Sequence, residues 1–263
     1  MMLNWKNLDT LASYEELKKV EPVNVAEAMS GENGAERVKN YSIPMMDGLT
    51  YNYAAKAVDD KVLAALAKLA GEAQLIEKYE SLYNGAVINT GEKRLVLHQL
   101  TRGQLGDDVV AEGVNKREFY VAQQQKIADF ANKVHAGEIT NAAGEKFTTV
   151  VQIGIGGSDL GPRAMYLALE NWAKVNNKFK MEAKFISNVD PDDAAAVLNS
   201  IDVAHSIFIL VSKSGTTLET LTNESFVKDA LAKAGLDASK HMIAVTSETS
   251  PLAKSDDYLA AFF

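Results

Sequence analysis

The sequence has no cysteine, no excess of positive charge and no long hydrophobic run. Without cysteine, disulfide bonds and thiolate chemistry are both excluded. The net charge of −8 and the isoelectric point near 5.1 argue against broad binding to nucleic acid or to anionic membranes. The first residues, MMLNWKNLDTL, lack the apolar core of a signal peptide, and no segment approaches the roughly 20 apolar residues of a membrane span. We therefore expect a cytoplasmic protein without nucleic-acid or membrane partners.

The most informative stretch runs from residue 147 to 175, where an apolar run is followed by glycines. The β-branched segment 149–153 predicts a strand buried on both faces of a parallel sheet. Gly154, Gly156 and Gly157 predict a turn in which the backbone takes positive φ angles and its N–H groups are open to an anion. Ser158 adds a hydroxyl to that turn. A strand, a glycine turn and a helix in this order are typical of an anion site.

The helix after this turn is predicted from Pro162 and from apolar residues at helical spacing. Proline has a φ angle suited to a helix and lacks an N–H group, so Pro162 fits the first turn. Met165, Leu169 and Trp172 then recur every three to four residues. A turn that merely joins strand to helix would look similar, because such turns are common in α/β domains.

Two better-known phosphate loops do not fit this turn. A dinucleotide fingerprint that starts at Gly154 has Asp159 where a third glycine is needed. A Walker A loop that starts at Gly156 has Pro162 where a lysine must reach the phosphates.

Upstream of this stretch the sequence predicts helices. Residues 1–40 give modest helical signals, and a long amphipathic helix is expected from Asp59 to near Gly85. His98 lies among apolar residues and is expected to be a structural histidine. Residues 116–136 predict another helix that stops at Gly137.

Downstream, apolar segments alternate with helical patterns. Further strands are predicted at 185–187, 206–212 and 241–247, and LAAFF at 259–263 could begin a fifth. Asp190 before Pro191 is expected to cap a short helix. Strands that alternate with helices predict a parallel sheet with helices on both faces.

In such a sheet, ligands bind at the carboxyl ends of the strands, where the segment SKSGTTLET (212–220) follows the third strand. Its hydroxyls and one ammonium group begin a helix, which suits a phosphate monoester. They belong to Ser212, Lys213, Ser214, Thr216 and Thr217. The alternative is ordinary helix capping, but a cap uses one such residue and leaves the others unexplained.

These motifs together resemble a known family. GIGGSDLGP (154–162), SNVDP (187–191) and SKSGTTLET, in this order and spacing, resemble the glucose-6-phosphate isomerase family, and NTGEKRLVLHQLTRG (89–103) is similar to a segment that precedes them there. The resemblance implies an α/β fold with a sugar isomerase (SIS) type parallel sheet flanked by helices. It further implies that 1–115 is a helical segment of a larger domain and that 116–263 is the first sugar isomerase domain.

The resemblance also implies roles for individual residues. Gly157 and Ser158 match positions on the sugar side of the site, and Glu219 matches a carboxylate with a positioning role. The positions that grip the phosphate are matched by Ser212, Lys213, Ser214 and Thr217.

The activity implied is the reversible isomerisation of glucose 6-phosphate to fructose 6-phosphate, in glycolysis and gluconeogenesis, by a homodimer without metal or other cofactor. A carboxylate moves a proton between C2 and C1 and a cation stabilises the enediolate. By the resemblance, that carboxylate, that cation and a ring-opening histidine lie further along the family's sequence. We therefore expect this chain to be an amino-terminal portion that is inactive by itself.

A binding module that senses sugar phosphates without chemistry remains the alternative. The discriminating feature is a general base over the sugar carbons, and the sequence offers no convincing one. Asp159 is expected to support its turn. His135, His205 and His241 lie at or near the ends of predicted elements, and none pairs visibly with a carboxylate.

Overall fold

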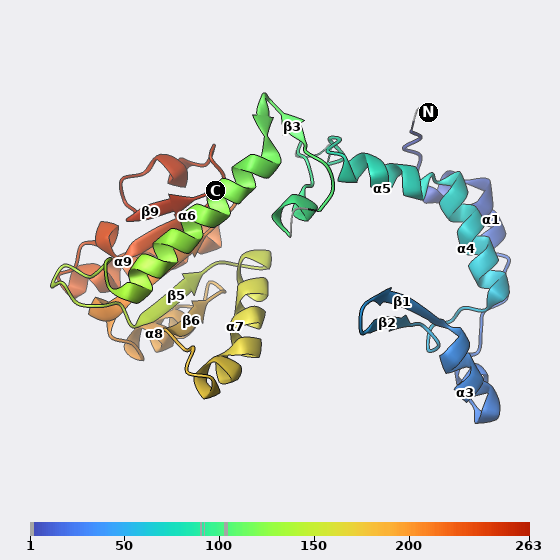
Figure 1. Ribbon diagram of the computed structural model, residues 1–263, viewed down its shortest axis with the longest axis horizontal. Coiled ribbons are helices and arrows are strands. Elements are labelled where there is room, and N and C mark those ends of the chain that lie inside the picture. The colour runs from blue at the N-terminus through green and yellow to red at the C-terminus, as the bar shows by residue number, and fades with distance from the viewer. Residues whose placement is uncertain (1–2, 90, 92, 103–104) are drawn as a thin grey trace. The chain divides into compact units, whose positions relative to one another are not determined.

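The computed structural model describes residues 3–89, 91, 93–102 and 105–263, in two compact units, Met1–Arg117 and Glu118–Phe263 (Figure 1). Residues 90, 92 and 103, which belong to the segment 89–103 discussed above, lie outside the described residues. Each unit has its own core.

The described part of the first unit contains short helices and two named hairpins. Its α-helices are α1 (Ala12–Leu17), α2 (Val25–Ala28), α3 (Gly31–Asn40), α4 (Asp60–Glu72) and α5 (Leu75–Tyr83), with 3-10 helices at Leu8–Thr10 and His98–Thr101. The hairpins pair β1 (Ser42–Met46) with β2 (Leu49–Asn52) and β3 (Val110–Ala111) with β4 (Val114–Asn115). The helix α6 (Lys116–Ala136) then leads into the second unit.

The single long helix expected from Asp59 to near Gly85 is wrong, because two helices meet at Gln74. Asp59 does cap the first of them, by accepting a hydrogen bond from the N–H of Val62 at 2.8 Å. Gln74 has a left-handed backbone with a φ angle of 54°, and its buried side chain accepts a hydrogen bond from the N–H of Asn4 at 2.7 Å. A distant partner therefore stabilises a break that the helical pattern does not reveal.

The second unit is a five-stranded parallel sheet with helices on both faces, as expected. Its strands are β5 (Thr149–Ile153), β6 (Glu182–Ile186), β7 (Ser206–Val211), β8 (Met242–Val245) and β9 (Ala260–Phe262). Its further helices are α7 (Gly157–Val175), α8 (Pro191–Asn199) and α9 (Leu218–Lys233), with 3-10 helices at Val203–His205, Ala238–Lys240 and Pro251–Lys254. All five predicted strands are present, and β6 begins three residues before the predicted range.

The strand order is β6-β5-β7-β8-β9, so the chain moves outward from β5 in one direction and then returns to the other side of it. Ile153 pairs with Ile186 on one side and with Leu210 on the other. The turns that follow β5 and β7 therefore lie next to each other at one edge of the sheet. Between neighbouring strands at which the connections change direction, α/β sheets leave a crevice for ligands.

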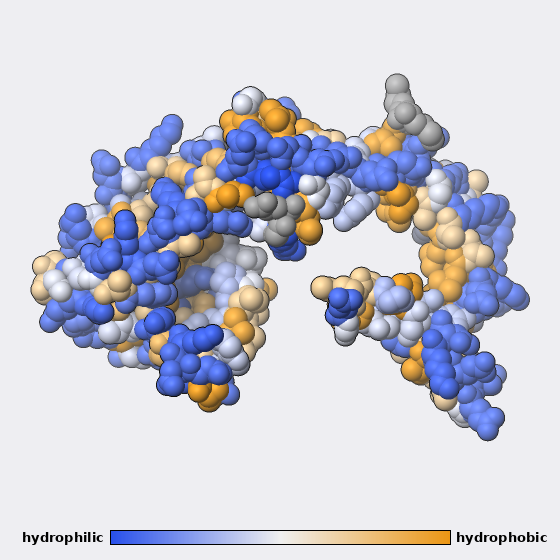
Figure 2. All heavy atoms as spheres, in the orientation of Figure 1, coloured by the Kyte–Doolittle hydropathy of each residue, from blue (hydrophilic) through white to orange (hydrophobic). Residues whose placement is uncertain are grey.

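The two faces of the sheet differ in how well they are covered. On the face of α8 and α9, Val151, Phe208 and Leu210 of the sheet and Leu231 of α9 are completely buried. On the other face, α6 packs through Val134, and the described surface is hollowed between α6 and α7 in the space-filling view (Figure 2). The sheet is therefore sealed on one face and partly open on the other.

Candidate functional site

The glycine turn after β5 is shaped by two glycines with different tasks. Of the three described glycines expected to have positive φ angles, only Gly156 does, at 58°. That expectation is wrong for Gly154 and Gly157. A Cβ atom on Gly154 would lie 2.8 Å from the carbonyl oxygen of Ser158, so this position needs glycine for close packing. Gly157 already begins α7 and has open space where a Cβ atom would be.

The helix α7 begins at Gly157, five residues before Pro162, so Pro162 is not in its first turn as expected. Inside a helix, proline cannot donate to the carbonyl four residues earlier, which here belongs to Ser158. The side chain of Gln152 supplies that donor instead, with 2.8 Å between its Nε2 atom and the Ser158 oxygen. A side chain on β5 thus permits the early start, which brings the amides of Gly157 and Ser158 to the end of the strand.

Asp159 supports this turn, as expected. Asp159 is 3% exposed, and its carboxylate lies 3.0 Å from both Nε and Nη2 of Arg163. The guanidinium of Arg163 also stands over the ring of Phe185, 4.9 Å from its centroid. A carboxylate in the first turn of a helix is favoured by the helix dipole. This ion pair therefore fixes the first turn of α7.

The turn after β7 is built around the buried hydroxyl of Ser212. Its Oγ atom accepts a hydrogen bond from the N–H of Gly215 at 3.1 Å and donates to Oγ1 of Thr217 at 3.2 Å. Gly215 has a φ angle of 68°, and a Cβ atom there would lie 2.1 Å from Oγ of Ser250. The turn therefore accepts only glycine at this position.

The start of α9 shows whether the hydroxyls of residues 212–217 serve as ordinary helix caps. Thr217 occupies the capping position, but within the described part of the chain its side chain makes no capping hydrogen bond. The first N–H groups of a helix have no carbonyl partner within the helix, and they carry the positive end of its dipole. Ser214, an exposed residue, accepts from both the N–H and the hydroxyl of Thr216, at 3.2 and 3.1 Å. The hydroxyl cluster is therefore not explained by capping.

The segment that follows β8 supports this turn from outside. The carbonyl of Ser212 accepts from the hydroxyl of Thr246 at 2.7 Å, and the carbonyl of Lys213 accepts from the hydroxyl of Ser247 at 2.7 Å. Lys213 itself is exposed. The turn is thus a rigid element that presents hydroxyls, a lysine and helix amides to solvent.

Behind the turn, α9 is held by a small polar network. Lys228 lies 3.0 Å from Glu224 and 2.9 Å from Asp257. The hydroxyl of Tyr258 donates to Glu224 at 2.6 Å, and burial raises the pKa of Tyr258 well above its usual value. This network fixes the helix whose amino end faces the site.

The segment SNVDP follows β6 at the same edge. Asp190 caps α8 as predicted, by accepting from the N–H groups of Asp192 and Asp193 at 3.0 and 3.4 Å. The carbonyl of Asn188 accepts from Nδ2 of Asn223 on α9 at 3.2 Å. This hydrogen bond connects the turn after β6 to α9, the helix that follows the turn after β7 (residues 212–217, the phosphate-type turn).

Thr220 and Asn223 on α9 are two buried polar residues that the sequence did not mark as candidate site residues. Both are 1% exposed, and among the described residues Oγ1 of Thr220 and Oδ1 of Asn223 have no hydrogen-bond partner. Their spacing of three residues places them on one side of α9, which is the only signal in the sequence. Glu219 is exposed in the first turn of the same helix.

Two expectations about histidines are wrong. His98 is exposed, and so it is not a buried structural residue. His205 does pair with carboxylates: its Nδ1 atom lies 2.7 Å from Asp202 and its Nε2 atom 2.9 Å from Glu145. The hydrogen bond to Asp202 raises the pKa of His205. This cluster precedes β7, at the amino ends of the strands, so it lies at the opposite edge of the sheet from the two turns.

The sequence model of the phosphoglucose isomerase family matches residues 52–256. The chain belongs to this family. Glucose-6-phosphate isomerase of Treponema denticola is 60% identical over 99% of this chain and 50% of its own length, and that of Treponema pallidum (strain Nichols) is 51% identical over 99% and 50%. The chain thus spans about half the length of the curated relatives it matches.

A solved structure from Chlamydia trachomatis, a glucose-6-phosphate isomerase, is similar to the chain with a TM-score of 0.79 and 35% identity. The match covers 98% of this chain and 48% of the other. The expected fold, an α/β sheet of the sugar isomerase type after a helical segment, is thereby confirmed. Among the described residues, none of the helices is long and apolar enough to span a membrane.

Proposed function

We propose that this chain is the amino-terminal portion of a glucose-6-phosphate isomerase and carries the phosphate-binding half of its site. Ser212, Lys213, Ser214 and Thr217 would hold the phosphate of glucose 6-phosphate or fructose 6-phosphate, together with the first amides of α9. The observation that carries the proposal is that this cluster stands at the helix end without serving as its cap. A phosphate dianion would satisfy both the amides and the hydroxyls.

Gly157 and Ser158 are assigned to the sugar side of the site. The turn that contains them lies beside the phosphate-type turn because β5 and β7 pair in register. Glu219, exposed in the first turn of α9, is assigned a positioning role. We assign 1–115 to a larger domain and 116–263 to the first sugar isomerase domain.

Catalysis would require groups from the other half of the protein. Proton transfer between C2 and C1 needs a base over the sugar carbons, and the His205 cluster lies at the wrong edge of the sheet. We further propose that the complete enzyme is a cytoplasmic homodimer that acts without nucleic-acid or membrane partners, and that it needs neither metal nor other cofactor.

The test compares binding with turnover in the 263-residue chain, purified free of host isomerase. We expect the chain to bind fructose 6-phosphate measurably and more tightly than fructose. We expect its turnover to be lower than that of a complete isomerase by several powers of ten, since acid/base and electrostatic groups each contribute about 10² to 10⁴ in rate. Enzyme-like turnover would overturn the assignment of the chemistry to the other half, and equal binding of fructose would overturn the phosphate site.

A sugar-phosphate-binding module without chemistry is the second candidate. It is favoured by the position of the described histidine–carboxylate cluster far from the two turns. The two candidates differ once the other half is supplied: an isomerase portion gains activity, and a binding module does not.

A further inference from the structure

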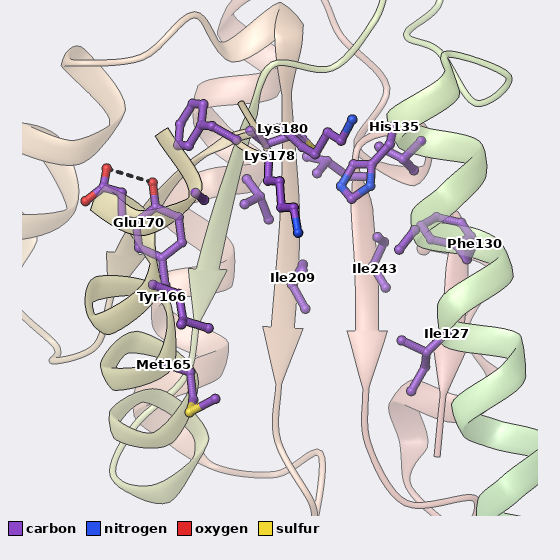
Figure 3. Close-up of a pocket in the computed structure, with 18 of the residues that line it drawn as sticks. Ile127, Phe130, His135, Met165, Tyr166, Glu170, Lys178, Lys180, Ile209 and Ile243 are labelled. Carbon is purple, nitrogen blue, oxygen red and sulfur yellow. Dashed lines mark hydrogen bonds between the residues drawn. The ribbon is translucent and has the colours of Figure 1, made fainter. Parts of the chain in front are cut away.

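An apolar groove lies between α6 and α7, above the sheet face opposite α8 and α9. It has a volume of about 550 Å³. Figure 3 shows Ile127 and Phe130 on one wall, Met165 on the other, and Ile209 and Ile243 on the floor. The groove is separate from the site proposed above, which lies at the strand ends.

The floor of the groove is the part of the sheet face between α6 and α7 on which no helix packs in the described structure. In β5, residues alternate between buried and half-buried, and the half-buried Val150 faces the groove. Ile209 of β7 and Val245 of β8 are likewise half-buried floor residues. Strands of parallel sheets are normally buried on both faces. The central strands therefore lack one covering element.

The walls are also more apolar than solvent-facing helices require. On α7, Met165 is 63% exposed and Leu169 is 50% exposed, and both line the groove. On α6, Ile127 is 45% exposed. Scattered exposed apolar residues are ordinary, but a contiguous apolar hollow marks an interaction surface.

The shape and lining of the groove favour a helix as its occupant. A helix satisfies its own backbone hydrogen bonds, so it can lie on apolar side chains that offer few partners. At the end toward the amino ends of the strands, Figure 3 shows Lys178, Lys180 and His135. The two lysine charges there suit the carboxyl end of a helix that runs antiparallel to the strands, since the carboxylate in the lining, Glu170, is paired with Lys174 at 2.7 Å.

The length of the relatives indicates where such a helix comes from. The curated relatives are about twice as long as this chain, so a complete protein of this family has a further half. We propose that one apolar helix from that half fills the groove and completes the sheet. This inference rests on the proposed function only in taking the chain as the amino-terminal portion.

The test uses thiol accessibility, which is clean here because the chain has no cysteine. Leu169→Cys places a probe on the groove wall. Leu167→Cys is the matched control: Leu167 is 60% exposed on the same helix, about 200° around its axis from Leu169. Each variant is made in the 263-residue chain and in a hybrid in which the chain is joined to the carboxyl-terminal half of the Treponema denticola relative. Alkylation is followed by peptide mass.

In the 263-residue chain, both positions are expected to react quickly. In the hybrid, we expect position 169 to react at least tenfold more slowly and position 167 to react as before. Equal reaction of position 169 in both proteins would overturn the proposal. Protection that appears already in the 263-residue chain and grows with its concentration would show that a second copy is the occupant, and would also overturn it.

Thermal unfolding supplies a second measurement. Leu169→Glu is expected to lower the melting temperature of the hybrid far more than that of the 263-residue chain, with Leu167→Glu as the control. A hybrid without cooperative unfolding would contradict a groove made for that half. Fructose 6-phosphate binding and isomerase activity are measured separately, so a failure of the proposed function with position 169 protected is distinguishable from a failure of this inference.

Discussion

Ser212 and Thr217 share a hydrogen bond across the turn after β7, with 3.2 Å between their hydroxyl oxygens. This bond directs the Thr217 hydroxyl toward the turn, although Thr217 stands at the capping position of α9. A threonine at that position usually caps the helix by accepting a hydrogen bond from an N–H group of its first turn. Here the turn is organised internally, and the amino end of α9 stays available to an anion.

The hydroxyls of Ser214 and Thr217 are predicted to contribute to phosphate binding. Each hydroxyl lost should weaken fructose 6-phosphate binding by about 0.5 to 1.5 kcal/mol, and by more where a charged oxygen loses its only partner. Calorimetry on the Ser214→Ala/Thr217→Ala variant, in the length of chain that binds, measures this. Ser225→Ala removes an exposed hydroxyl of α9 that, among the described residues, bonds only to the Leu221 carbonyl, and this variant should bind as the parent does. Unchanged binding by the double variant would exclude the turn after β7 as the phosphate site.

Gly157→Ala should separate binding from stability. The position has an ordinary φ angle and open space for a Cβ atom, so the fold should keep its melting temperature. Because the methyl group would stand where the backbone meets the sugar, binding of fructose 6-phosphate should fall. A variant that loses stability and keeps full affinity would mean that Gly157 serves the turn alone.

Gly215→Ala should destabilise the second unit, and Gly144→Ala serves as the control that separates backbone strain from steric crowding. Gly144 also has a positive φ angle, 78°, but nothing lies within 4 Å of its missing Cβ. Its substitution should therefore show only the backbone strain, about 1 to 2 kcal/mol. At Gly215 the contact with Ser250 adds crowding of about 1 to 3 kcal/mol. Urea unfolding of the two variants measures the difference, and equal values would contradict a steric role for Ser250.

The cluster of His205 with Asp202 and Glu145 predicts a pH dependence of stability. The pKa of His205 is raised above its ordinary value of 6.5, so its contribution is complete below that pH and is lost as the pH rises through the raised value. The pKa of Asp202 is lowered from 3.8, so its contribution to stability is lost only as the pH falls below 3.8, outside the range tested here. The melting temperature of the parent minus that of His205→Gln should therefore decrease between pH 6 and pH 9. A difference that is constant or rises over this range would show that the ion pairs do not form in solution.

The sequence by itself determined the local order of this protein. The β-branched run 149–153, the glycines after it and the periodic residues of α6 are local signals, because strand, turn and helix preferences act over a few neighbouring residues. Asp190 was predicted as a cap for the same reason, since its partners are two and three residues away. The family motifs are contiguous in the sequence as well.

Only the tertiary structure decided which of these pieces meet. His205 reaches Glu145, 60 residues away, and Gly215 packs against Ser250, which no periodicity encodes. The start of α7 depends on Gln152, because that side chain supplies the donor that Pro162 lacks. The strand order sets the turns after β5 and β7 side by side and leaves the face between α6 and α7 open, because both follow from long-range pairing and packing.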